Sequence, residues 1–403
     1  MKKLYFFVTI IIIITAVNLY AEAGLNDITM QQFLLTAEKD TAVENLKELT
    51  DAYIDVSLNT PVFDRVEAIT ETNEFDIEKQ RYALRFYPKG WGERKYGNKI
   101  LEAQKTLNRF EYDVKFNDAV KLRYDLALEY LEVSSLLKIN RRLLVIVNEY
   151  MNTLDQKKVF SLYLQTEEKL TDINLKMVEL QNMKTGIISR INSAAASTAS
   201  IYFDQESLAT FDNLNEVVSR IAANDSTVNA ALSKMQNDID LKNNEYLLEK
   251  VKNKNLISYI QGDFDADHAP DFEKTYSLKL AVKLPFINSG REELTRLKRL
   301  HILKKLDFLE SRNAVSEEIK KLNREFQRYQ RQFKVLADVK QKRNDLVGND
   351  GLNKKDRFTL QFTILKTDER LAMLDAQIRS TYIRIVDLSG DLSAVPLKNF
   401  IAR

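Results

Sequence analysis

The sequence contains no cysteine and only two histidines, His268 and His301, which lie far apart. Without cysteine the chain has no disulfide, no thiol chemistry and no lipid-modified amino-terminal cysteine. A histidine without a second ligand at metal-site spacing is more often a loop or helix-surface residue than a zinc ligand. The sequence also lacks a Ser/His/Asp set and a glycine-rich phosphate loop after a strand. These absences argue against an enzyme and against a metal or other cofactor.

An excess of charge of either sign is also missing, because 60 lysines and arginines face 58 aspartates and glutamates. Proteins that bind nucleic acid usually carry a basic surplus on one surface. We therefore expect no nucleic-acid partner.

Long hydrophobic runs are absent except at the amino terminus. Lys2 and Lys3 precede an apolar run over residues 4–17, and Ala21-Glu22-Ala23 follows, as in a secretory signal. The alternative is a retained membrane anchor, but roughly fourteen apolar residues are fewer than the roughly twenty that span a bilayer. We predict a signal peptide over residues 1–23. Any later membrane crossing would then have to be made by strands.

Proline and glycine, the residues that interrupt helices, are scarce and unevenly placed. Four of the five prolines bracket residues 61–88 and 255–285. Neither proline nor glycine occurs over residues 98–185 or 291–347, which is the condition for long uninterrupted helices. At 1.5 Å per residue the second stretch would be about 85 Å long, more than a compact globular domain needs.

Apolar residues in this second stretch follow the alternating four-three spacing of a coiled coil. They are Val315, Ile319, Leu322, Phe326, Tyr329, Phe333 and Leu336. The next segment continues the same phase with Leu360, Ile364, Leu371, Leu374, Ile378 and Ile385. Both patterns predict long helices that pack along one apolar seam.

The two halves of the chain resemble one another. Asn26-Asp27-Ile28-Thr29 has a counterpart in Asn224-Asp225-Ser226-Thr227, and Pro88 has one in Pro285. Both pairs are separated by roughly two hundred residues, which indicates a tandem duplication. We predict a first repeat over 24–223, a second over 224–390, and a tail over 391–403. Each repeat reads as helix, β-hairpin and long helical hairpin, so the predicted fold is mostly α with a small β part.

The predicted helical hairpins cover residues of about 93–192 and 291–389. The turn of the second hairpin is visible as Gly348-Asn349-Asp350-Gly351. The repeat places the corresponding turn of the first hairpin at residues 151–156, although no glycine occurs there.

Apolar and polar residues alternate in the segments before the long helices, as in a barrel strand with one lipid-facing and one wet face. The apolar series are Tyr276, Leu278, Leu280, Val282 and Leu284 in the second repeat and Tyr82, Leu84 and Phe86 in the first. The opposite series contain Arg81, Arg85, Lys279 and Lys283, which we predict to line a barrel lumen. Partner strands at 61–72 and 255–264 would complete β-hairpins of about 61–88 and 255–285.

Four strands cannot close a barrel, and an open sheet in lipid would leave unpaired backbone groups at its edges. A membrane barrel therefore requires several copies of the chain. The alternative is a soluble β cap on a coiled-coil rod, because the first hairpin carries many charges.

Several motifs resemble those of TolC-like outer-membrane efflux proteins. Ile28-Thr29-Met30-Gln31-Gln32-Phe33-Leu34 resembles their start, and residues 348–390 look like their closing helix. Leu284-Pro285-Phe286-Ile287-Asn288-Ser289-Gly290-Arg291 is similar to their proline, apolar, glycine, arginine signature. The resemblance covers essentially the whole mature chain.

This resemblance implies a homotrimer with a twelve-stranded β-barrel in the outer-membrane lipid and a twelve-helix α-barrel tunnel in the periplasm of a Gram-negative bacterium. It implies an exit duct of a tripartite efflux or type I secretion system, docked to a periplasmic adaptor (membrane fusion) protein and an inner-membrane pump. It also implies a charged aperture at the periplasmic end, for which Arg343, Asp345 and Asp350 are the candidates. The alternative function is a periplasmic coiled-coil structural or adaptor protein without a pore.

Overall fold

The computed structural model describes residues 28–54, 60–72, 80–154, 159–197, 201, 203, 208–223, 229–265, 275–283, 290–347, 352–394 and 396–402. The predicted signal peptide and Asp350 lie outside the described residues. The chain forms two compact units, and each takes segments from both halves of the sequence. The helical unit comprises Met1–Glu44, Lys115–Asn229 and Val315–Arg403, and the strand unit comprises Asn45–Val114 and Ala230–Ala314.

One order of elements occurs twice along the chain. The first half contains α2 (Met30–Leu35), η1 (Thr36–Lys39), α3 (Thr41–Ile54), β1 (Phe63–Thr72), β2 (Gln80–Pro88), α4 (Trp91–Met151) and α5 (Phe160–Ala195). The second contains α6 (Phe211–Ala223), α7 (Ala230–Lys252), β3 (Ile257–Asp265), β4 (Tyr276–Val282), α9 (Arg291–Val347) and α10 (Lys354–Ser389). The predicted mostly helical class with a small β part is confirmed.

The long helices begin and end where local chemistry permits. α4 has 61 residues and α9 has 57, and α9 contains no glycine or proline. α4 ends at Met151 although no glycine is present, which agrees with the break expected from the repeat. Asn353 caps α10 by accepting a hydrogen bond from the backbone N–H of Asp356 at 2.8 Å. Gly390 ends the same helix with φ at 86°, a conformation that favours glycine.

The core of the helical unit lies along the seams of its helices. In α5 the buried residues Ile173, Leu180 and Ile187 are seven positions apart, as a coiled coil requires. At the end of α4 the ring of Tyr150 stacks on Phe358 of α10 with centroids 4.0 Å apart. Aliphatic residues of α4 and α5 surround this pair, so the three helices share one apolar cluster.

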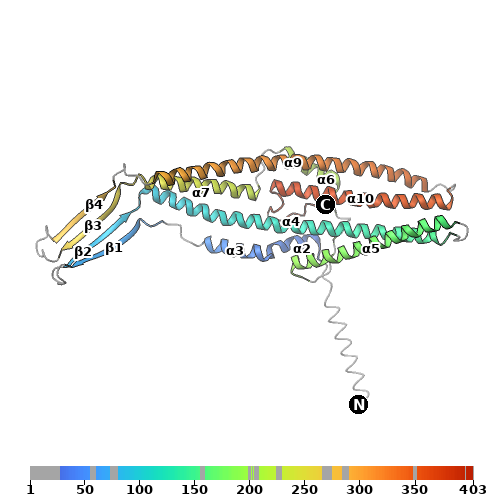
Figure 1. Ribbon diagram of the computed structural model, residues 1–403, viewed down its shortest axis with the longest axis horizontal. Helices are drawn as coiled ribbons and strands as arrows, with labels where there is room; N and C mark the ends of the chain where they lie inside the picture. The colour runs from blue at the N-terminus through green and yellow to red at the C-terminus, as the bar shows by residue number, and fades with distance from the viewer. Residues whose placement is uncertain are drawn as a thin grey trace, which may run out of the picture. The chain divides into compact units, whose positions relative to one another are not determined.

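The strand unit contains one antiparallel sheet in the order β1-β2-β3-β4, which Figure 1 shows at the end of the strand unit's helices. The register aligns Glu67, Arg85, Gln261 and Lys279 in one row across the four strands. β2 and β3 join the two hairpins, so β1 and β4 are the edges of the sheet. None of the described helices is both long enough and apolar enough to cross a bilayer.

Candidate functional site

The sheet has two chemically different faces. Because side chains alternate along a strand, the register places polar residues from all four strands on one face. This polar face carries Arg65, Glu67, Glu71, Arg81, Arg85, Gln261, Asp263 and Lys279. The many charges of the first hairpin therefore lie on the same face as Lys279 of the second hairpin.

Asp263 is the centre of the polar face. Its side chain is only 3% exposed, and it accepts hydrogen bonds from Gln261 at 2.5 Å and from the Ser277 hydroxyl at 3.1 Å. The Lys279 ammonium lies 3.2 Å from its carboxylate and the Arg81 guanidinium 3.6 Å. Two cations from neighbouring strands thus neutralise one buried carboxylate.

Arg85 lies in the adjacent row of the polar face. Its guanidinium donates to the Gln261 side chain at 2.7 Å and lies 3.6 Å from the carboxylate of Glu67. It also lies over the ring of Tyr259, 4.4 Å from the centroid. The structure therefore brings Arg81, Arg85 and Lys279 onto one face. Lys283 follows β4, and its side chain is exposed without an ion-pair partner among the described residues.

The opposite face of the sheet is apolar and uncovered. It carries Val66, Tyr82, Leu84, Leu278 and Leu280, all of them exposed, with Leu278 at 78%. In water such a continuous apolar surface is unfavourable, and monomeric soluble proteins rarely expose one.

The two described aperture candidates at the end of α9 have different partners. Arg343 donates to the Thr367 hydroxyl of α10 at 2.8 Å. Asp345 accepts from the Gln341 side chain one turn earlier at 3.1 Å. Arg343 therefore joins the two helices of this hairpin, whereas Asp345 interacts within its own helix.

A buried carboxylate joins three helices of the helical unit. Glu369 of α10 is only 7% exposed at its side chain and forms an ion pair with Lys176 of α5. It also accepts from Lys366 at 3.0 Å and from Asn140 of α4 at 3.1 Å. Burial by itself raises the pKa of Glu369, but the hydrogen bonds from Lys176, Asn140 and Lys366 outweigh it and lower the pKa.

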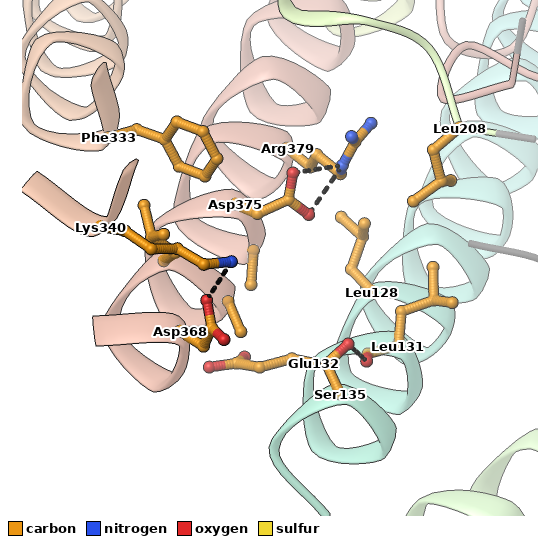
Figure 2. A pocket seen from close by; sticks show the side chains of 13 residues that line it. Leu128, Leu131, Glu132, Ser135, Leu208, Phe333, Lys340, Asp368, Asp375 and Arg379 are labelled. Carbon is orange, nitrogen blue, oxygen red and sulfur yellow. Dashed lines mark hydrogen bonds and ion pairs between the residues drawn. The ribbon is translucent and has the colours of Figure 1, made fainter. Parts of the chain in front are cut away.

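A cavity of about 360 Å³ lies between α4, α9 and α10 of the helical unit. Figure 2 shows Phe333 and Lys340 of α9 on one side and Leu128 and Leu131 of α4 on the other. Glu132 extends from α4 toward the side where Lys340 meets Asp368. Burial raises the pKa of Glu132, and the nearby Glu129 raises it further. No cluster of three or more potential metal ligands occurs in the described part of the chain.

Solved structures of outer-membrane channels match this chain over most of its length. The outer membrane protein VceC of Vibrio cholerae aligns over 90% of this chain and 96% of its own, with a TM-score of 0.62 and 11% identity. The open state of the Neisseria gonorrhoeae MtrE outer membrane channel aligns over 92% and 90%, with a TM-score of 0.65 and 9% identity. The Campylobacter jejuni CmeC outer membrane channel aligns over 90% of this chain and 85% of its own, with a TM-score of 0.57 and 10% identity. The fold is that of TolC-like outer-membrane channels.

The likeness to these channels is one of fold. No protein-family model and no curated protein sequence matches the chain. At such low identity a shared fold does not by itself transfer an activity, so the function of this channel-like chain has to be argued from its own residues.

Sequence reasoning missed several residues of this TolC-like fold that the structure brings together. Gln261 and Asp263 were predicted only to lie in a partner strand. The signal that could have placed them on the polar face is the alternation of Tyr259, Gln261 and Asp263 with Ile260 and Phe264. Glu369 and Glu132 had no signal in the sequence, because their partners and surroundings come from other helices.

Proposed function

We propose that the chain is one protomer of an exit duct in the outer membrane of a Gram-negative bacterium, within a tripartite efflux or type I secretion system. The single observation that carries this proposal is the two-faced sheet. Its exposed Leu278 and Leu280 suit contact with lipid, whereas Arg81, Arg85 and Lys279 on the other face suit a water-filled lumen. The chain would act as a passive conduit and not as an enzyme.

The duct requires several copies of the chain. β1 and β4 are the edges of an open sheet, and unpaired backbone groups in hydrocarbon cost several kcal/mol each. A homotrimer would close a twelve-stranded barrel in the outer-membrane lipid. In the same trimer α4, α5, α9 and α10 of each copy would form a twelve-helix periplasmic tunnel.

The remaining parts of the proposal follow from this arrangement. Residues 1–23 would be removed on export, residues 24–223 and 224–390 would be the two repeats, and 391–403 the tail. Arg343, Asp345 and Asp350 would lie at the periplasmic aperture. A conduit supplies no energy, so a periplasmic adaptor and an inner-membrane pump would be its partners.

Matched substitutions on the two faces of the sheet test the duct. Leu280→Arg should reduce the amount of folded oligomer in outer-membrane fractions, because a cation against hydrocarbon costs about 2–4 kcal/mol near the bilayer midplane. Lys283→Glu should leave assembly intact and shift the ion preference of single channels in planar bilayers toward cations. Lys283 is the cleaner probe, because Lys279→Glu would place a second carboxylate beside buried Asp263.

Heat-dependent gel migration reports assembly, and conductance reports the pore. If both variants assembled like the wild type and neither altered conductance, the sheet would not cross a membrane. A periplasmic coiled-coil protein without a pore would then be the better interpretation.

A further inference from the structure

The cavity in Figure 2 has an unbalanced charge. Three carboxylates and two cations line it: Glu132, Asp368, Asp375, Lys340 and Arg379. Lys340 pairs with Asp368 at 2.6 Å, and Arg379 pairs with Asp375 at 3.0 Å. Within each of these pairs the positive and the negative charge cancel. Glu132 is the remaining charge, and it has no ion-pair partner among the described residues.

Apart from Ser135, the rest of the cavity wall is apolar. It includes Leu128 and Leu131 of α4 and Leu371, Ala372 and Ala376 of α10. Phe333 lies on one side of the cavity, and its ring packs perpendicular to that of Phe211 of α6 with centroids 4.8 Å apart. An aromatic ring attracts a cation that reaches its face, most strongly where water is excluded.

We propose that this cavity binds a small organic cation with an apolar body, such as a quaternary ammonium. Glu132 supplies the opposite charge, Phe333 an aromatic wall, and the leucines and alanines of α4 and α10 the contact for the apolar body. The volume of about 360 Å³ lies in the range of small-molecule sites. A simple anion would be repelled by the uncompensated charge of Glu132. A metal ion would have one unpaired carboxylate as a ligand, because Asp368 and Asp375 are already in ion pairs.

Binding at this cavity does not require a pore. A second statement, that the bound cation is cargo passing through the helical tunnel, does rest on the proposed function. The two statements are therefore tested by different measurements on the same protein preparation.

The experiment is a calorimetric titration of the purified full-length oligomer in detergent with benzyltrimethylammonium. Wild type should show saturable binding, and Glu132→Gln should weaken it about tenfold or more, because a charged partner is lost. Phe333→Leu keeps an apolar wall without the ring and should weaken binding about threefold to tenfold. Glu129→Gln is the matched control, since it removes the same charge one turn earlier on α4 outside the cavity.

Absence of saturable binding to wild type, or equal binding by wild type and Glu132→Gln, would overturn the proposal. Benzyl alcohol, a neutral ligand with the same ring, binding as tightly as the cation would also overturn it. If Glu132→Gln failed to fold by circular dichroism, the Phe333→Leu titration would decide, with unchanged binding counting against the cavity. Conductance of the same samples tests the duct separately: channels that conduct without binding the cation contradict the cavity alone.

Discussion

Trp91 shows how exposure of a single side chain separates two interpretations. It is the only tryptophan in the chain, and at such a position a tryptophan either anchors the protein at a membrane interface or packs at the junction of strand and helix. In the structure it begins α4 three residues after β2 ends, and it is 93% exposed. A large amphipathic ring with so much of its surface exposed suits the interface between lipid and water.

We therefore expect Trp91 to report insertion into a membrane. In liposomes its fluorescence should shift to shorter wavelength, and lipids brominated near the headgroup should quench it more than lipids brominated at the chain end. The matched control is Phe160→Trp in a Trp91→Phe background, because Phe160 is an exposed aromatic residue at the start of α5 in the helical unit. Equal quenching of the two tryptophans, or none of Trp91, would contradict the interfacial position.

At the scale of elements, buried polar groups decide how the helices of the helical unit are joined. Glu369 connects α10 to α4 and α5 through Asn140 and Lys176. The hydrogen bonds make its folded-state pKa lower than its unfolded value, so the ionised form is the one that the fold stabilises. This contribution is complete above the unfolded pKa and is lost as pH falls through the folded pKa.

Glu369→Gln should accordingly lower the free energy of unfolding at neutral pH by about 1–2 kcal/mol. The difference between wild type and variant should shrink as the pH falls from neutral through the folded-state pKa of Glu369, because the carboxyl group of the wild type then becomes protonated. Denaturant unfolding followed by circular dichroism at neutral and at acidic pH measures this. The control Glu317→Gln breaks an exposed pair with Lys320 on α9 and should change stability little at either pH. A pH-independent effect of Glu369→Gln would show that packing, and not the charge, is responsible.

At the scale of the whole molecule, the open edges of the sheet demand partners. A single copy leaves β1 and β4 with unpaired backbone groups and leaves the apolar face of the sheet uncovered. In the proposed barrel, copies that pair edge to edge within lipid would satisfy these backbone groups and cover the apolar face.

The purified protein should therefore be a trimer in mild detergent, with a mature amino terminus just after Ala21 or Ala23. Light scattering corrected for bound detergent gives the mass of the oligomer, and mass spectrometry of the denatured chain gives the cleavage site. A monodisperse monomer that retains its secondary structure would contradict the closed barrel. An uncleaved chain would contradict only the signal peptide.

The sequence alone determined the features that depend on local periodicity. The absence of glycine and proline over residues 291–347 predicted a long helix, and α9 covers the same residues. Alternation over residues 275–284 predicted a strand that separates Leu278 and Leu280 from Lys279, and β4 forms over Tyr276–Val282. The repeat even predicted that α4 ends near Met151, where no breaker residue is present. Each of these signals lies within one segment or recurs at a fixed interval, so it can be read without knowing which segments meet.

Only the tertiary structure decided which charges meet. Arg85 and Gln261 are 176 positions apart, and Asn140 and Glu369 are 229 apart. Their contacts depend on the register between strands and on the rotation of each helix about its axis, and a shift of one residue would turn these side chains to other faces. Three carboxylates therefore differ in their environment and not in their local sequence pattern. They are Asp263, which is neutralised, Glu369, which is stabilised, and Glu132 of the cavity, which has no ion-pair partner among the described residues. That difference arises from packing, because a carboxylate's charge is balanced or left unbalanced by groups that other elements bring to it.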